Sequence, residues 1–169
     1  FIEFIFLRHT GIISESKNKS ELFNYLGDIY YYGYGVEQNY LEAKKYFELS
    51  AQLNDPKALN LLGILYFNRQ GVDQNYEKAK EYYELSAKQN NSIAIFNLGI
   101  IYLNGFGVER DYEKAIDYFK LSNQLNNPSA LITLGGIYEL GSYVEQNYSK
   151  AKEYYELAAK QNSSKAFRC

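Results

Sequence analysis

The side chains best suited to nucleophilic or metal chemistry are single copies at distant positions of the sequence. His9 is the only histidine, and Cys169, the last residue, is the only cysteine. A nucleophile–base pair or a zinc site needs several such groups close together. Because no cysteine lies near His9 in the sequence, we expect no catalytic residue, no metal site and no cofactor.

Carboxylates could also do acid–base chemistry, but here they recur along the chain at a fixed distance. Glu77, Glu81 and Glu84 alternate with Lys80 at spacings of three and four, which is typical of a solvated, lightly ion-paired helix face. A residue that recurs in repeat after repeat is a poor candidate for a single active site. We therefore predict that the protein is not an enzyme, and we disfavour the alternative of a hydrolase-like or ligand-binding repeat protein.

The elements that would position any site recur every 36 residues. A Leu-Gly dipeptide marks this step at Leu26-Gly27, Leu62-Gly63, Leu98-Gly99 and Leu134-Gly135. An aromatic pair follows the same step at Tyr46-Phe47, Tyr82-Tyr83, Tyr118-Phe119 and Tyr154-Tyr155. Since the two registers agree, the sequence indicates four tandem copies of one structural unit.

Each unit contains two segments with helical periodicity, which we name helix A and helix B. In the third unit, helix A places Ala94, Leu98 and Tyr102 on one side; helix B carries the aromatic pair on its apolar side. Short polar residues that can cap a helix start precede helix B at Asn39, Asn75, Asp111 and Asn147. Others precede helix A at Asp55, Asn91, Asn127 and Ser163. Asparagines able to close helix B by a left-handed turn are Asn54, Asn90, Asn126 and Asn162.

These signals predict an all-α fold, a right-handed alpha/alpha superhelix (solenoid) of about four helix-turn-helix repeats of 36 residues each. The expected repeats cover residues 20–55, 56–91, 92–127 and 128–163. Residues 1–19 form an unassigned N-terminal extension, and residues 164–169 form the truncated start of a fifth repeat. The chain starts without Met and stops abruptly, so we expect it to be part of a longer product.

Glycine in the middle of helix A needs a compensating reason, because it costs roughly 1 kcal/mol relative to alanine. The sequence places one in each repeat, at Gly27, Gly63, Gly99 and Gly135. We expect large helix B rings, such as Tyr82 and Tyr83, to pack over the missing Cβ. The Gly-x-Gly pairs that follow helix A allow positive φ, and because they join two helices they do not indicate a phosphate loop.

The repeat pattern resembles the Sel-1-like repeat, a relative of the tetratricopeptide repeat. The third unit shows the motif as Ala94, Leu98, Gly99, Tyr102, Gly105, Gly107, Val108, Asp111, Lys114, Ala115, Tyr118 and Phe119. Arg69 and Tyr143 replace loop glycines in the second and fourth units, so those two hairpins are expected to bend differently. The resemblance implies an α/α solenoid and an adaptor or scaffold that binds other proteins, and it names no partner.

In such stacks helix A lines the concave surface, to which each repeat contributes one row of side chains. The candidate groove residues are Asn24, Asp28, Tyr31, Asn60, Ile64, Phe67, Phe96, Ile100, Leu103, Ile132 and Glu139. Gly136 lies in the same row as Ile132 and Glu139. The middle of this groove is apolar, which suits an apolar helix or an extended peptide. The alternative is that these side chains pack between neighbouring repeats and meet no partner.

Composition narrows the choice of partner. The 18 Lys and Arg against 20 Asp and Glu give a net charge of −2, which disfavours nucleic acid. The apolar run at residues 1–7 is too short to span a bilayer and lacks the features of a secretory signal, so we expect no membrane insertion, and a cytoplasmic location is favoured. A protein or peptide partner remains, with end-to-end self-association of a structural solenoid fragment as the alternative.

Overall fold

The structure is a computed structural model that describes residues 19–141 and 144–166, with side chains described up to Gln161. These residues form eight helices and contain no strand. The helices are α3 (Lys19–Tyr32), α4 (Tyr40–Ala51), α5 (Pro56–Asn68), α6 (Tyr76–Ala87), α7 (Ser92–Asn104), α8 (Tyr112–Gln124), α9 (Pro128–Leu140) and α10 (Tyr148–Ala166). The all-α repeat fold predicted from the sequence is confirmed, with helices alternating between helix A and helix B.

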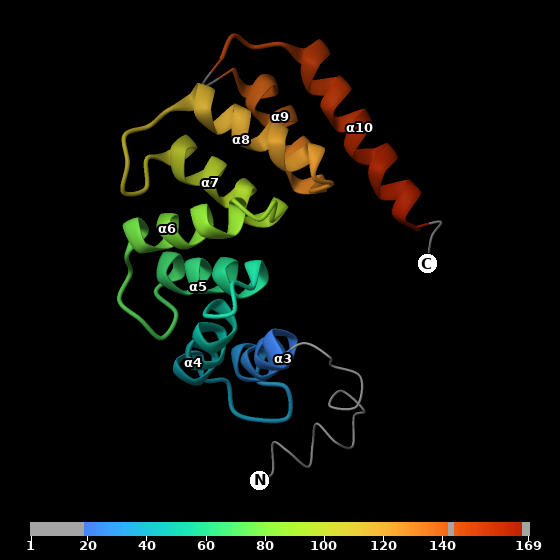
Figure 1. Cartoon of the computed structure of the whole chain (residues 1–169). Coiled ribbons are helices and arrows are strands. Elements are labelled where there is room, and N and C mark those ends of the chain that lie inside the picture. Colours follow the sequence, from blue (N-terminus) through green and yellow to red (C-terminus); the bar gives the residue numbers. More distant parts are fainter. Residues whose placement is uncertain (1–18, 142–143, 167–169) are drawn as a thin grey trace. The chain divides into compact units, whose positions relative to one another are not determined.

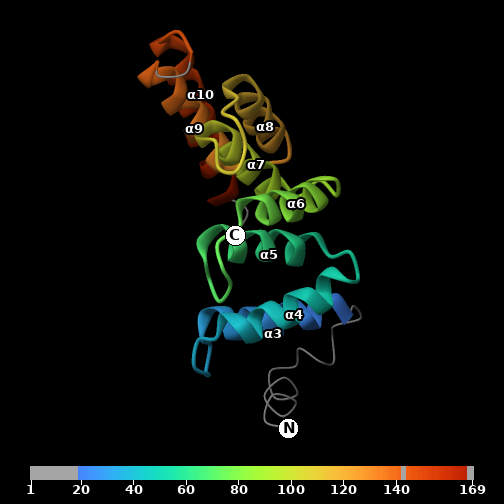
Figure 2. The same cartoon turned by 90° about the vertical axis from the view of Figure 1, so that its left-hand side faces the viewer.

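The chain forms two compact units, residues 1–82 and residues 83–169, and the boundary falls within α6. In the first unit, α3 lies beside α4, and α4 in turn contacts α5 (Figure 1). In the second unit, α7 pairs with α8 and α9 with α10, and α8 contacts α9; Figure 2 shows the same helices from the side. The helix B elements α4, α8 and α10 therefore pack on their own helix A, and α4 and α8 also pack on the next helix A.

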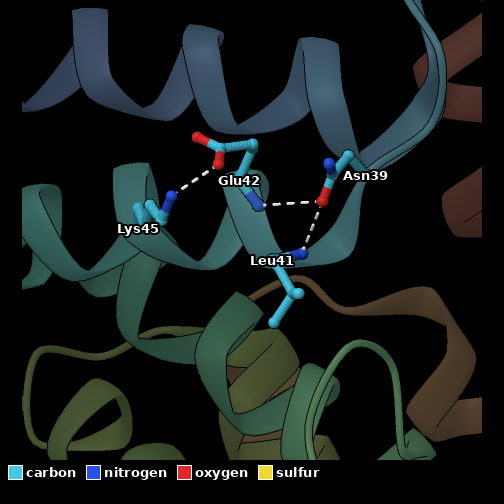
Figure 3. A network of polar contacts seen from close by, with 4 residues as sticks. All are labelled: Asn39, Leu41, Glu42 and Lys45. Carbon is cyan, nitrogen blue, oxygen red and sulfur yellow. Dashed lines mark hydrogen bonds and ion pairs between the residues drawn. The ribbon is translucent and has the colours of Figure 1, made fainter.

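Helix starts are capped by the polar residues expected at those positions. The Asn39 side chain accepts hydrogen bonds from the backbone N–H of Leu41 and of Glu42, both at 3.1 Å (Figure 3). Lys45 pairs with Glu42 one turn further along α4. The other caps that accept from a backbone N–H two or three residues ahead are Asp55, Asn75, Asn91, Asp111, Asn127 and Asn147.

The turns after helix B use left-handed asparagines, as expected. Asn54, Asn90 and Asn126 have φ of 57°, 60° and 64°. Helix A ends in the same conformation, and here the expectation for Arg69 was wrong. Arg69 has φ 58° and its N–H bonds the Leu65 carbonyl, as Gly105 bonds Ile101, so the second hairpin closes like a glycine-containing one. Tyr143 lies outside the described residues.

Two boundaries differ from the prediction. Helix α3 begins at Lys19, one residue inside the expected extension; residues 1–18 lie outside the described residues. Helix α10 runs to Ala166, through Asn162, where a turn was expected, and through Ser163, which was expected to cap a new helix. In the first and third repeats helix B contacts the following helix A, and no fifth helix A is present among the described residues. Residues 164–166 thus continue α10, and 167–169 lie outside the described part.

The core of each unit lies between helices A and B. In the first unit, Ala43 and Phe47 of α4 form a buried cluster with Leu61, Leu62 and Leu65 of α5. In the second unit the fully buried large side chains are Tyr83, Ile95, Leu98, Ile101, Phe119, Leu131 and Leu134. No described helix combines the length and the apolar composition that a bilayer span requires. The handedness of the stack stays a prediction.

Candidate interaction surface

Ring-on-glycine contacts fix the distance between helices A and B. A Cβ built on Gly99 would lie 2.5 Å from Cε1 of Phe119, and one built on Gly135 would lie 2.6 Å from Cε1 of Tyr155. The ring of Phe47 occupies the same place over Gly27. Helix A therefore packs closer to helix B than a side chain at the glycine position would allow. This packing fixes which side of helix A faces away from helix B.

The two rings of each aromatic pair have different roles. In the first, third and fourth repeats the second ring covers a glycine. The first ring stacks on a helix A tyrosine: Tyr82 lies 5.8 Å from Tyr66 with an interplanar angle of 15°. Tyr82 thus has a stacking partner near the C-terminal end of α5, and the packing of Tyr82 and Tyr83 over Gly63 stays a prediction. Tyr83 and Gly63 are both buried. The equivalent stacks are Tyr30 on Tyr46, Tyr102 on Tyr118 and Tyr138 on Tyr154.

A lysine of helix B lies over the helix A tyrosine in three repeats, which closes the outer end of each stack. Lys114 Nζ lies 4.0 Å from the ring centre of Tyr102. The equivalent pairs are Lys78 with Tyr66 and Lys150 with Tyr138. A hydrogen bond to the Tyr102 hydroxyl raises the pKa of Lys114 above its usual value. This lysine stays protonated and completes the stack.

A glutamine in the loop ties the end of helix A to the start of helix B, a feature that sequence reasoning missed. Gln74 Nε2 donates to the Phe67 carbonyl at 2.9 Å, and Gln38 and Gln146 bond Tyr31 and Glu139 in the same way. The third repeat has Arg110 here, whose Nε donates to the Asn104 carbonyl. The 36-residue recurrence of Gln before the cap was the signal that could have found this lock.

In the first unit, the predicted groove residues divide into buried and partly open ones. Asn24 and Asn60 are only 5% and 4% exposed, so their side chains are part of the interior and offer little surface to a partner. Asp28 is partly buried and pairs with Lys57, whose Nζ lies 2.6 Å from Asp28 Oδ2. Ile64 is half-buried and packs against the α4–α5 cluster.

The two aromatic groove residues of the first unit are also held by internal contacts. Tyr31 packs on Tyr40 at 5.4 Å, and its hydroxyl donates to Gln70. Burial, more than any other influence, raises the pKa of Tyr31, so it remains a neutral donor. Phe67 packs edge-on against Tyr76 at 5.3 Å. These internal contacts favour, for Tyr31 and Phe67, the alternative that the predicted groove residues pack within the chain.

The second unit presents a more open apolar surface. Phe96, Ile100 and Leu103 of α7 are half-buried, and Ile132 of α9 is 52% exposed. The starts of the two helices lie side by side, because Asn127 Nδ2 donates to the Ser92 carbonyl at 3.2 Å. Phe96 leans on Phe119, 5.3 Å away, whereas Gly136 leaves room beside it: a Cβ there would meet only the Tyr155 hydroxyl, at 3.8 Å.

Ile93 belongs to the same apolar surface as Phe96 and Ile100, and it was not among the predicted groove residues. It is 54% exposed and lies on α7 three residues before Phe96 and seven before Ile100, which places the three on one helix face. The equivalent residues are Glu21, Lys57 and Ser129. An apolar residue at a repeat position that is otherwise polar was the sequence signal for it.

The stripe ends at a charged position in the fourth repeat. Glu139 is exposed and its Oε2 accepts from the Tyr155 hydroxyl at 2.7 Å. This hydrogen bond is the main cause that raises the pKa of Tyr155. Within the part of the chain that the structure describes, no three His, Cys, Asp or Glu side chains gather as a metal site would require. Glu139 thus places a charge beside the apolar groove residues of the second unit.

The sequence pattern of the Sel1 repeat matches residues 24–55, 56–91, 92–127 and 128–163. A search of curated protein sequences finds no significant match.

Several solved structures are similar to this chain. A Sel1 repeat protein from Oxalobacter formigenes is 26% identical with a TM-score of 0.74, and the match covers 85% of this chain and 57% of that one. A protective antigen with this repeat fold from uropathogenic Escherichia coli is 28% identical with a TM-score of 0.71, covering 87% and 32%. An immunity protein from Pseudomonas aeruginosa is 26% identical with a TM-score of 0.63, covering 84% and 52%. The chain thus covers less than two thirds of each of these proteins.

Proposed function

Since the chain belongs to the Sel1 repeat family, we propose that it is a protein-interaction scaffold that binds a segment of a partner protein on its helix A surface. Repeats of this family generally serve protein interaction and are generally not enzymes. The similar structure described as an immunity protein is consistent with a protein as the partner.

One observation carries the proposal: apolar side chains of α7 and α9 stay open to solvent in the second unit. Ile93 and Ile132 are each more than half exposed, and Ile100 of α7 is partly buried. Exposed apolar stripes of this kind mark interaction sites more often than plain surface. We name Ile93, Phe96, Ile100, Leu103 and Ile132 the α7–α9 stripe.

The shape and chemistry of the stripe favour one class of partner. The side chains of the stripe recur every three or four residues along α7. A partner could dock the apolar side of an amphipathic helix on them, or lay an extended apolar peptide along them. The few charges on the stripe argue against recognition of an acidic or a basic segment.

The test uses a defined probe, a peptide selected on the purified chain from a random display library. Ile132→Asp and Ile100→Asp should each weaken binding of that peptide by tenfold or more, because a charge must then be desolvated in the contact. Leu121→Asp is the matched control, since Leu121 of α8 is 43% exposed and lies outside the stripe. Binding is measured by fluorescence anisotropy, and circular dichroism verifies that each variant is folded. Unchanged affinity in both folded stripe variants would rule the proposal out.

A further inference from the structure

The end of α7 carries the only Asn-Gly dipeptide of the sequence, Asn104-Gly105. The equivalent pairs in the other repeats are Tyr32-Gly33, Asn68-Arg69 and Leu140-Gly141. Asn104 is the last residue of α7 and is exposed, and Gly105 follows it in a left-handed turn with φ 75°. Because glycine has no Cβ, its backbone nitrogen can approach the preceding side chain with little steric hindrance. The third repeat therefore contains a backbone nitrogen suited to attack a side-chain amide.

The reaction of this dipeptide is deamidation, which needs water and no other reactant. The backbone nitrogen of Gly105 gives its proton to water or hydroxide, and its electron pair forms a bond to Cγ of Asn104. The bond from Cγ to Nδ2 breaks, and Nδ2 takes up a proton and leaves as ammonia. Water then opens the resulting succinimide ring at either carbonyl, which leaves aspartate or isoaspartate at position 104.

In the folded chain, hydrogen bonds hold both reacting groups apart. Nδ2 of Asn104 donates to the Ile100 carbonyl at 2.9 Å, and the Gly105 N–H donates to the Ile101 carbonyl at 2.9 Å. Both hydrogen bonds must break before the nitrogen can lose its proton and meet Cγ. Only the last turn of α7 has to open for this, and local opening of a helix end costs less free energy than unfolding of the chain.

Arg110 holds this turn closed from the loop side. Its Nε donates to the Asn104 carbonyl at 3.0 Å, and this carbonyl belongs to the peptide bond between Asn104 and Gly105. Its Cγ covers Gly105, since a Cβ built on Gly105 would lie 2.8 Å from that atom. The glutamines at this position in the other repeats bond the carbonyl equivalent to that of Leu103, one residue earlier. A charged donor makes the stronger hydrogen bond, so Arg110 is the better lock for this peptide.

We propose that Asn104 is a site of spontaneous deamidation, and that Arg110 limits the rate by keeping the last turn of α7 closed. Both products carry a carboxylate in place of the neutral amide, one residue after Leu103 of the α7–α9 stripe. Isoaspartate also lengthens the backbone by one carbon, which is incompatible with the closed turn. The modification thus changes the charge at one end of the stripe, and it requires no bound partner.

Peptide mapping by mass spectrometry measures the reaction on the full chain after incubation near neutral pH. Methylation by an isoaspartate-specific methyltransferase identifies isoaspartate. Asn104 should be modified at least about tenfold faster than Asn68, which ends α5 at the same repeat position but precedes Arg69. In denaturing guanidinium chloride Asn104 should react faster than in the folded chain, because the turn is then open.

Two substitutions separate the dipeptide from its lock. Arg110→Gln installs the residue that the other repeats carry, and it should raise the rate at Asn104 in the folded chain by about threefold or more, with no change in the denatured chain. Arg69→Gly creates a second Asn-Gly dipeptide in a hairpin that Gln74 closes, so Asn68 should then react faster than Asn104. Leu121→Asp, near the other end of α8, is the control and should leave both rates unchanged. Circular dichroism verifies that each variant is folded.

Each part of the proposal has an outcome that overturns it. If Asn104 stays intact for as long as Asn68 does in the unaltered chain, Asn104 is not a deamidation site. A folded Arg110→Gln chain that reacts at the unaltered rate, or more slowly, overturns the role of Arg110. Equal rates in the folded and the denatured unaltered chain would show that the closed turn does not limit the reaction.

Discussion

At the residue scale, the contact between Gly99 and Phe119 leaves no room for a side chain. Because a Cβ at Gly99 would lie 2.5 Å from a ring atom of a buried phenylalanine, Gly99→Ala should destabilise the fold by about 1–3 kcal/mol through overpacking. Gly99→Leu should be more severe and could prevent folding. Chemical denaturation followed by circular dichroism measures the free energy of unfolding.

Gly136 provides the matched control within the same unit. It also lies inside a helix A, but a Cβ there would meet only the Tyr155 hydroxyl at 3.8 Å. Gly136→Ala should therefore gain helix propensity and stabilise the fold by up to roughly 1 kcal/mol. Should Gly99→Ala stabilise as Gly136→Ala does, the ring-on-glycine contact would not set the helix distance.

The tyrosine stacks make the stability sensitive to high pH. Burial is the main cause that raises the pKa of Tyr118 above its ordinary value of 10.0. The unfolded chain therefore loses this proton at a lower pH than the folded chain, so the free energy of unfolding should fall as the pH rises above about 10. Tyr118→Phe keeps the ring on Tyr102 and should reduce the fall. Denaturation at pH 9 and pH 11 measures it, and identical losses in both proteins would contradict the role of Tyr118.

At the element scale, each helix B begins at a side chain that accepts from the backbone. Asp111 Oδ1 accepts from the Lys114 N–H at 2.9 Å, and removing this acceptor leaves an unpaired donor. Asp111→Ala should cost about 1 kcal/mol of stability, whereas Asp111→Asn keeps a good cap and should cost much less. Thermal unfolding compares the two variants, and equal losses would mean that the charge, not the cap, stabilises α8.

The helices and their caps could be predicted from the sequence because both depend on local signals that recur in phase. Gly27 and Asn39, for example, need no knowledge of distant residues to be interpreted. What could not be predicted depends on neighbours in space. Arg69 accepts a left-handed conformation because the hairpin around it requires the turn, and α10 continues past Asn162 although the same asparagine position closes helix B in the other repeats.

The candidate surface was harder to predict than the helices, because exposure depends on which repeats lie next to each other. Asn24 and Asn60 occupy the same repeat position as Ile132, yet the asparagines are buried and the isoleucine is half exposed. Periodicity assigns all three to one helix side and cannot distinguish them. The polar residues at the position of Ile93 in other repeats were a better guide to an open surface.

At the scale of the whole molecule, repeats gain stability from their neighbours, so a repeat with a neighbour on one side only should open more readily. Phe119 of α8 is completely buried beneath α7 and α9, whereas Tyr155 of α10 is 36% exposed. Backbone amides of α10 up to Gln161 should therefore exchange hydrogen at least about tenfold faster than those of α8, which corresponds to an opening free energy lower by about 1.4 kcal/mol. Hydrogen exchange with mass spectrometry resolves the two helices. Equal protection of α8 and α10 in dilute solution would show that stability does not depend on the covering of each helix B by a following helix A.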